Sequence, residues 1–197
     1  MTVSQSLNAI DVALFHMLNG VGPVTAVDWL LLLLSNQWSI VLLLPLFVVQ
    51  VRAAVTTWRR VLLVGAIAVA LLGAVDGGGT LLKQRINRPR PCRVLTDIRA
   101  VAPCSGSPSM PSNHAANLFA LAAFTVVCTR RRPLLWFGIA AAVGYSRVRL
   151  GVHYPFDVLG GALWGGTLGW AAGVATRRLS TTSAATSVSP QLCAEDV

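Results

Sequence analysis

Residues 61–82, VLLVGAIAVALLGAVDGGGTLL, decide the fold class of this 197-residue chain, because Asp76 is the only charged side chain among them. A helix needs about 20 consecutive apolar residues to cross a bilayer. Similar apolar runs occupy residues 27–51, 113–129, 134–151 and 157–176. The runs at 113–129 and 134–151 are short, so they fit only a thin or locally compressed bilayer. This pattern predicts about five transmembrane helices.

The composition points to the same class: 54% of the residues are hydrophobic, 12% are charged and the mean hydropathy is +0.65. These values lie outside the usual range of soluble domains. We therefore expect an all-α integral membrane helical bundle over residues 1–179, followed by a disordered polar tail over residues 180–197. Residues 5–20 predict an additional amphipathic or interfacial helix. Its apolar stripe comprises Leu7, Ile10, Leu14, Met17 and Leu18, and its polar residues are Asn8, Asp11 and His16.

The formal charge of +9 is distributed by loop, which argues against a nucleic-acid partner. Clusters at residues 52–60, 130–132 and 177–178 fall on one side of the membrane by parity, and an excess of basic residues marks the cytoplasmic side. No cleavable signal peptide is expected, because the first basic residue is Arg52. Residues 83–99 carry six basic side chains on the opposite side. Ligand binding is the favoured explanation for Lys83 and Arg90, whereas contact with lipid headgroups or positioning at the interface is favoured for Arg85, Arg88, Arg93 and Arg99.

Four ends of predicted spans meet on this second side and carry the unusual polar residues. They are Lys83 and Arg90 after the second span, Ser112, Asn113 and His114 at the start of the third, Arg147 and Arg149 at the end of the fourth, and His153 and Asp157 at the start of the fifth. Lysine and arginine complement phosphate oxygens, and a helix amino terminus beginning at Ser112 and Asn113 binds anions. These residues predict an interfacial phosphate site.

Two histidines suit displacement at phosphorus, in which one attacks and the other protonates the departing oxygen. His153 and Asp157 are four residues apart, so the carboxylate can fix the tautomer of the imidazole on one face of a helix turn. Such a pair alone is also typical of an incidental ion pair. His114 has no neighbouring carboxylate in the sequence and suits the acid, whereas His16 is expected to be a surface or packed histidine.

The spacing Lys83-(six residues)-Arg90-Pro91, then Pro111-Ser112-Asn113-His114, then Ser146-Arg147-(five residues)-His153-(three residues)-Asp157 resembles the three-part signature of the type 2 phosphatidic acid phosphatase family. The resemblance implies a membrane phosphatase without a metal or other cofactor, with active-site segments at 83–114 and 146–157. It implies that His153 forms a phosphohistidine, Asp157 orients it and His114 is the general acid. Lys83, Arg90, Ser112, the backbone of Asn113 and Arg147 would hold the phosphoryl group.

Two positions depart from the family pattern, in which residue 113 is usually glycine and residue 149 often aromatic. The asparagine at 113 keeps its N–H, so the anion site is expected to survive. Arg149 suggests a preference for substrates with more than one phosphate. Asp76 is costly inside an apolar span, and an ion pair with an arginine of the site is the favoured explanation over a proton relay.

Cysteine spacing fits no zinc pattern, and no metal site is expected. Cys92 and Cys104 fall in one loop on the predicted external side, where a disulfide and two free thiols are equally favoured. The glycines at 161, 165, 169 and 173 form a stripe typical of close helix packing.

The function expected from these features is hydrolysis of a membrane lipid phosphate or diphosphate in the bilayer, with a polyprenyl (undecaprenyl) diphosphate as the favoured substrate. Phosphatidic acid, phosphatidylglycerophosphate and a lipid A phosphate are the close alternatives. Rivals from other classes are an anion transporter and a non-catalytic lipid-binding protein. The resemblance suggests a bacterial cytoplasmic membrane with the site facing the periplasm or exterior; the residues give no oligomeric state.

Overall fold

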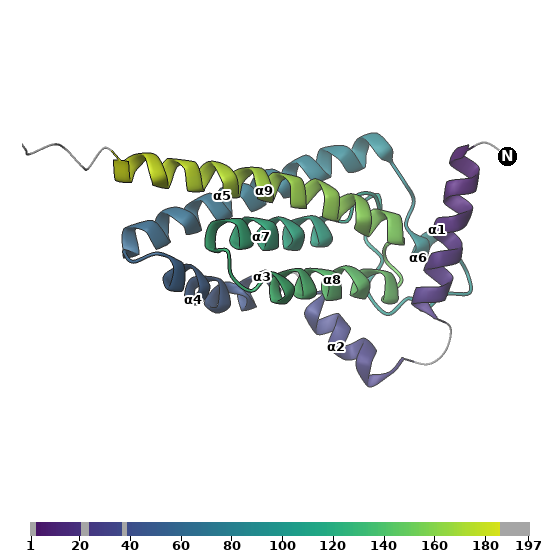
Figure 1. The fold of residues 1–197 in the computed structure, drawn as a ribbon. Helices are drawn as coiled ribbons and strands as arrows, with labels where there is room; N and C mark the ends of the chain where they lie inside the picture. The colour runs from purple at the N-terminus through teal and green to yellow at the C-terminus, as the bar shows by residue number, and fades with distance from the viewer. Residues whose placement is uncertain (1–2, 21–23, 37–38, 186–197) are drawn as a thin grey trace, which may run out of the picture.

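The computed structural model describes residues 3–20, 24–36 and 39–185, and these residues form helices and loops without a strand. The helices are α1 Val3–Asn19, α2 Ala26–Leu34, α3 Ser39–Leu42, α4 Leu44–Ala54, α5 Trp58–Ile86, α6 Pro91–Val94, α7 Asn113–Thr129, α8 Pro133–Arg149 and α9 Pro155–Ala185. In Figure 1, α7 runs through the middle of the bundle between α9 and α8, and α1 lies crosswise at one end. The all-α prediction is confirmed for the described residues.

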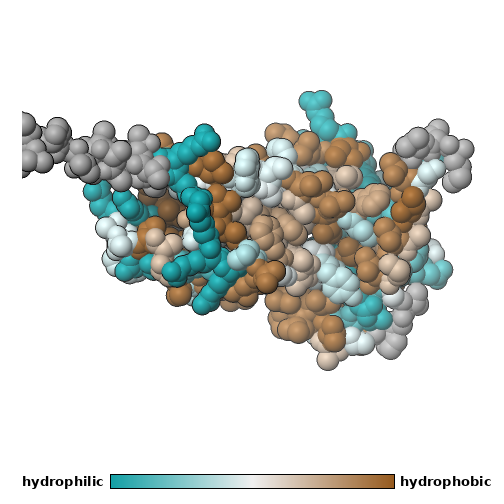
Figure 2. Space-filling model, in the orientation of Figure 1, coloured by the Kyte–Doolittle hydropathy of each residue, from teal (hydrophilic) through white to brown (hydrophobic). Residues whose placement is uncertain are grey.

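The bundle has an apolar exterior as well as an apolar core. Leu62, Val69, Leu134 and Leu163 are exposed, with relative accessibilities between 61% and 90%. Figure 2 shows brown apolar side chains over the middle of this face, and teal hydrophilic side chains gathered at the end near the carboxy-terminal trace. Apolar side chains on both the inside and the outside of a helix bundle are typical of a protein surrounded by lipid.

Five spans are not confirmed. Among the described residues, two helical stretches are long and apolar enough to cross a membrane, Trp58–Val94 and Pro155–Leu179, whereas Leu44–Ala54 and Asn113–Thr129 are apolar but shorter. The predicted span at residues 27–51 is divided among α2, α3 and α4. Ser35 caps the end of α2, and Pro45 in the first turn of α4 has no N–H to continue a preceding helix. The mean hydropathy of this run conceals both interruptions.

Helix α1 confirms the predicted amino-terminal helix, but its buried face combines polar Asp11 and Asn19 with Phe15. Asp11, Phe15 and Asn19 are buried, whereas Ile10 and Met17 are 52% and 70% exposed. This arrangement has a local cause, since the Asn19 amide donates to the carbonyl oxygens of residues 99, 148 and 149. Three residues of the predicted stripe, Leu7, Ile10 and Met17, therefore face away from the bundle, whereas Leu18 packs against the cluster around Phe15.

Helix α9 packs on α7 through the glycine stripe. An added Cβ would lie 1.8 Å from the Ala116 carbonyl oxygen at Gly165 and 2.2 Å from the Ala120 carbonyl oxygen at Gly169. The same placement at Gly166 meets no atom within 4 Å. The packing role predicted for the stripe is confirmed. Helix α9 continues through Ala185, into the segment assigned to the polar tail, while residues 186–197 lie outside the described residues, so the predicted tail stays a prediction there.

Gly165→Val tests this contact. The added side chain has to separate α7 from α9, so we expect it to lower the free energy of unfolding by about 1–3 kcal/mol or more. Gly166→Val is the matched control, with the same helix and the same change in propensity. The measurement is the thermal unfolding midpoint of each purified variant in one detergent. Equal destabilisation by the two substitutions would contradict the contact.

Candidate active site

A cavity of about 360 Å³ lies at the end of the bundle where α5 ends and α7 begins. Six of the eight residues predicted for the site line it: Lys83, Arg90, Asn113, His114, Arg147 and His153. Ser112 and Asp157 lie behind this lining, and both are fully buried. The span ends that were expected to converge therefore do so, although residues 83 and 153 are far apart in the sequence.

His153 and Asp157 are held by the start of α9. Pro155 begins this helix, and the Asp157 Oδ2 accepts a hydrogen bond of 2.8 Å from the Tyr154 backbone N–H, which caps the first turn. The same oxygen faces the His153 Nδ1 at 3.4 Å. This separation is longer than an ordinary hydrogen bond, and Nδ1 has no other partner. Asp157 is therefore placed to orient the imidazole rather than to hold it tightly.

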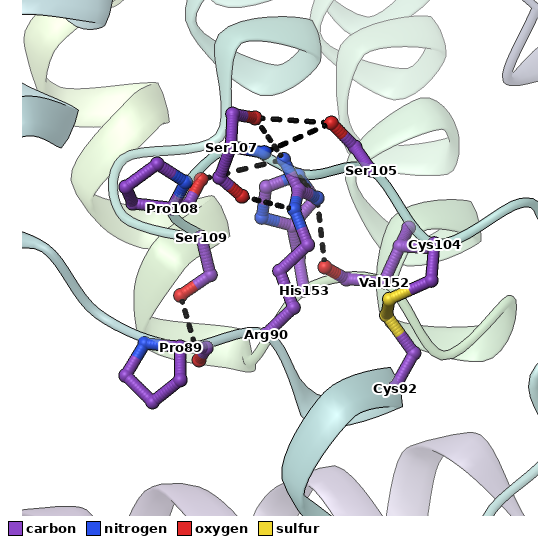
Figure 3. The surroundings of a disulfide bond; sticks show 10 residues. All are labelled: Pro89, Arg90, Cys92, Cys104, Ser105, Ser107, Pro108, Ser109, Val152 and His153. Carbon is purple, nitrogen blue, oxygen red and sulfur yellow. Dashed lines mark hydrogen bonds between the residues drawn. A yellow bond between two sulfur atoms is a disulfide. The ribbon is translucent and has the colours of Figure 1, made fainter.

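Arg90 contacts the other nitrogen of His153 (Figure 3). Its Nη1 lies 3.1 Å from the His153 Nε2 and donates to the Val152 carbonyl oxygen at 3.0 Å. Since a guanidinium only donates, Nε2 must be the acceptor, and the ring proton then resides on Nδ1 facing Asp157. This is the tautomer that leaves the pocket-facing nitrogen with a free electron pair.

The remaining Arg90 donors bind the loop that follows Cys104. Nε donates to the Ser107 carbonyl oxygen at 2.8 Å, and Nη2 reaches the Ser107 hydroxyl at 3.0 Å and the Pro108 carbonyl oxygen at 3.3 Å. Lys83 Nζ donates to the same Pro108 carbonyl at 3.2 Å. Lys83 and Arg90 thus donate hydrogen bonds to neutral oxygens. The charged oxygens of a phosphoryl group are stronger acceptors and can take the place of these neutral ones.

Arg147 reaches the cavity from the last turn of α8. Its Nη1 donates to the carbonyl oxygen and the hydroxyl of Ser35, at the end of α2, while its Nε is buried without a partner. On the opposite wall, Ser112 caps α7, and its backbone N–H donates to the Asp157 carbonyl oxygen at 2.9 Å. The Ser112 hydroxyl is buried without a partner. Of these two donors, the Arg147 Nε belongs to a cavity-lining side chain and is available to an anion, whereas the Ser112 hydroxyl lies behind the lining.

Asp76 has amide partners instead of the arginine that was expected. Its Oδ1 accepts from Asn113 Nδ2 at 2.9 Å and from Asn117 Nδ2 at 3.2 Å. A side chain at Gly79 would meet the Asn113 Oδ1 at 2.9 Å, so this glycine makes room for the asparagine. The ion-pair prediction is wrong because amides from α7 reach the carboxylate. The Asn113 side chain lines the cavity wall on the α5 side.

Three arginines assigned from sequence to headgroups or to extra phosphate have structural partners. Arg88 pairs with Asp11 and Asp157, and Arg99 and Arg149 both pair with Asp28. Arg149 does not line the cavity, so its proposed preference for a second phosphate is contradicted. Sequence set Arg90 apart from Arg88 and Arg99 but could not identify the carboxylates that pair with Arg88, Arg99 and Arg149, because these partners lie far away in the chain.

The disulfide left open by the sequence is present between Cys92 and Cys104 (Figure 3). It closes the segment that leads into Ser105 and Ser107, two cavity-lining residues that sequence reasoning missed. Their position directly after a cysteine in the loop bearing Arg90 was the available signal. His16 is exposed on α1, as expected for a histidine outside the site.

Burial lowers the pKa of His153 to about 3, and Asp157 opposes this shift only in part. The ordinary value is about 6.5, so between these pH values the unfolded chain binds a proton that the folded chain does not. The free energy of unfolding therefore falls as the pH falls through this window.

Comparison of wild type with His153→Asn isolates this effect. We expect the wild type to lose stability relative to the variant as the pH falls from about 6.5 to 4.5, at up to about 1.4 kcal/mol per pH unit. Unfolding is followed in one detergent over this pH range. Parallel curves for the two proteins would contradict the buried neutral imidazole.

The chain matches the family model of the PAP2 superfamily over residues 60–180. A lipid A 4'-phosphatase of Bacteroides thetaiotaomicron is 35% identical over 112 residues, which are 53% of this chain and 50% of that protein. The chain thus spans about half the length of that relative. An undecaprenyl-diphosphatase of Sulfolobus acidocaldarius is 27% identical over 157 residues, covering 79% of this chain and 73% of that one.

A solved structure shows the same fold. The PAP2-type phosphatidylglycerolphosphate phosphatase of Bacillus subtilis has a TM-score of 0.65 at 22% identity, with 90% of this chain and 87% of that one covered. The family match extends across the segments that carry Lys83, His114 and His153, and so across the whole cavity. The chain belongs to the PAP2 superfamily.

Proposed function

We propose that this protein hydrolyses a phosphate ester or diphosphate of a membrane lipid through a phosphohistidine on His153. The observation that carries the proposal is a buried imidazole whose acceptor nitrogen faces a cavity that is also lined by Lys83, Arg90 and Arg147. Three cations around one nucleophile match the charge of a phosphoryl group approaching an in-line displacement. His114 lines the same cavity and supplies a second imidazole.

Arg90 couples substrate binding to activation of the nucleophile. Its contact with Nε2 occupies the electron pair that has to attack phosphorus. A charged phosphoryl oxygen is a stronger acceptor than an imidazole nitrogen or a carbonyl oxygen, so it draws the guanidinium away. Nε2 is then released next to the phosphorus that Arg90 holds.

The reaction proceeds in two balanced steps. The Nε2 electron pair forms the N–P bond, the bond between phosphorus and the leaving oxygen breaks, and His114 gives that oxygen its proton. Burial and the neighbouring cations lower the pKa of His114 to about 4, and the negative charge of a bound phosphoryl group counters these cations and favours the protonated form. The phosphorylated imidazole carries positive charge next to the Asp157 carboxylate, which stabilises it. Neutral His114 then takes a proton from water, the water oxygen bonds to phosphorus, and the N–P bond breaks to release phosphate and restore Nε2.

The location is proposed to be a bacterial cytoplasmic membrane, with the site on its outer side and the lipid tail among the helices. Arg59 and Arg60 begin α5 and Arg177 and Arg178 lie far along α9, so these basic residues are at the opposite helix ends from the cavity. Basic clusters mark the cytoplasmic side. The Cys92–Cys104 disulfide beside the cavity suits an oxidising compartment.

Histidine variants test the mechanism with purified protein and a panel of lipid phosphates. We expect His153→Ala to abolish phosphate release, and His114→Ala to lower kcat by about 10²–10⁴-fold for alkyl phosphates. With an aryl phosphate, whose leaving oxygen needs no proton, His114→Ala should accumulate a base-stable, acid-labile phosphohistidine detected by mass spectrometry. His16→Ala, at an exposed histidine, is the matched control.

The rival functions predict different outcomes in this experiment. An anion transporter would retain flux in proteoliposomes after His153→Ala, and a non-catalytic lipid-binding protein would release no phosphate from any substrate. Turnover that survives His153→Ala would remove the phosphohistidine mechanism.

The substrate favoured from sequence is a polyprenyl diphosphate, and the name of the Sulfolobus relative supports it. Asp76 instead favours a lipid monophosphate, whose leaving group is an alcohol. A lipid A phosphate, the substrate class in the name of the Bacteroides relative, is of this kind. The Asp76 carboxylate lines the cavity and has no cationic partner among the described side chains. It lies about 10 Å along α5 from Lys83, on the side of the bilayer interior where the leaving group sits. A phosphate leaving group would be repelled there, whereas a hydroxyl would donate to it.

Asp76→Asn separates these substrates. We expect the ratio of kcat/KM for polyprenyl diphosphate to that for a lipid monophosphate to rise by roughly fivefold to tenfold, because a like charge is removed near the leaving group. The measurement is phosphate release from both substrates in matched mixed micelles. Asp97→Asn, at an exposed aspartate outside the cavity, should leave the ratio unchanged. An unchanged ratio in Asp76→Asn would remove the charge argument.

A further inference from the structure

The carboxylate that faces the nucleophile is held on both of its oxygens. Asp157 Oδ2 accepts from the Tyr154 N–H and faces His153, while Oδ1 accepts a hydrogen bond of 2.9 Å from the Arg88 Nη1. The side chain of Asp157 has no exposed surface. Arg88 therefore fixes the orientation of the Asp157 carboxylate relative to the His153 imidazole.

Arg88 is itself fixed by the amino-terminal helix. Its Nη1 lies 2.7 Å from Asp11 Oδ2, and its Nη2 donates to Asn8 Oδ1 at 3.1 Å. The guanidinium carbon stacks 3.9 Å from the centre of the Tyr154 ring. The other oxygen of Asp11 accepts from the Phe156 backbone N–H at 2.9 Å. Helix α1 thus contacts Arg88 through Asp11 and Asn8, and the first turn of α9 through Asp11.

The ion group contains two carboxylates and one guanidinium. Asp11 and Asp157 have no exposed side-chain surface, and both contact the same Arg88 nitrogen. If Arg88 had Asp157 as its only partner, it would neutralise the charge that has to stabilise a positive imidazole. Sharing Arg88 with Asp11 leaves one net negative charge in the group. This charge is balanced when His153 becomes positive upon attack on phosphorus.

Arg88 differs in this respect from its neighbour Arg90. Arg88 does not line the cavity, whereas Arg90 does and has no carboxylate partner. Both arginines precede a proline in the same short segment. Arg90 faces the cavity in which the substrate is proposed to bind, whereas Arg88 contacts the Asp157 carboxylate next to His153.

We propose that Arg88 and Asp11 are positioning residues of the nucleophile, Arg88 by fixing the Asp157 carboxylate and Asp11 by keeping Arg88 from neutralising it. The inference rests on the proposed phosphohistidine function, because it assigns the two residues to the same reaction. It also gives α1 a role, since this helix carries Asp11 on its buried face.

The two residues have opposite electrostatic effects on His153, which a structural role would not produce. Arg88→Gln removes a positive charge and should make His153 easier to protonate; Asp11→Asn lets Arg88 bind Asp157 alone and should make it harder. The other charged groups near the dyad, Arg90 and Arg147, are the same in both variants. Asp11→Asn also keeps the oxygen that accepts from Phe156, which favours folding.

The experiment compares kcat, KM and the pH profile of kcat/KM for the full-length protein. We expect Arg88→Gln to lower kcat about tenfold or more and Asp11→Asn to lower it severalfold, with KM within about threefold of wild type. The acid limb should move to higher pH in Arg88→Gln and to lower pH in Asp11→Asn. Arg88→Lys, which keeps the charge, should recover most of the loss. Arg85→Gln and Asp97→Asn are matched controls at exposed positions.

Acid limbs that move in the same direction, or not at all, would overturn the proposal, as would an equal loss in Arg85→Gln. A wild type without turnover on any lipid phosphate would count against the proposed function instead. In that case the same variants are compared by ¹⁵N NMR titration of the histidine-labelled protein, with His153 assigned by substitution. Opposite shifts of its titration support the positioning roles, and equal titrations overturn them.

Discussion

Burial of charge in an apolar chain is the constraint on which the rest of this structure depends. An ionised group removed from water needs a partner, and the chain has few acidic residues to provide one. Asp28 serves both Arg99 and Arg149, and Arg88 serves both Asp11 and Asp157. The three buried carboxylates, Asp11, Asp28 and Asp157, thus pair with arginines that shape the end of the bundle.

The cations that line the cavity are not among the arginines that pair with these carboxylates. Lys83, Arg90 and Arg147 donate to carbonyl, hydroxyl or imidazole acceptors, and none of the three forms an ion pair within the described part of the chain. Neutral acceptors satisfy their geometry without neutralising their charge. An anionic ligand can therefore gain three charge-assisted contacts at this end of the molecule without breaking an ion pair.

The sequence predicted which side chains gather at the candidate site, because they lie at fixed offsets at helix ends. His153 and Asp157 come together through one helix turn, and Lys83 and His114 through the alternation of helices across the bundle. What sequence could not supply were partners set by tertiary contact. Arg88 and Arg90 are two residues apart and chemically identical; the family spacing singled out Arg90, but the sequence did not show that Arg88 pairs with Asp11 and Asp157.

The errors in the fold have a related cause. Average hydropathy joined α2, α3 and α4 into one span, since it does not register a cap at Ser35 or a missing donor at Pro45. For α1, the apolar stripe was correctly located but its direction depended on where Asp11 and Asn19 found partners. In both cases individual polar groups decide the structure, and a mean over many apolar residues hides them.

Close packing of α9 on α7 connects the fold to the chemistry. At Gly161 an added Cβ would lie 2.4 Å from the Ser112 carbonyl oxygen, so a glycine is required beside the start of α7. The same approach allows the Ser112 N–H to donate to the Asp157 carbonyl oxygen at 2.9 Å. The helix carrying His114 is thereby tied to the helix whose first turn holds the carboxylate behind His153. A bulkier residue at Gly161 would push apart the first turns of α7 and α9 and so separate His114 from His153, because the backbone of Ser112 is the first group that its side chain meets.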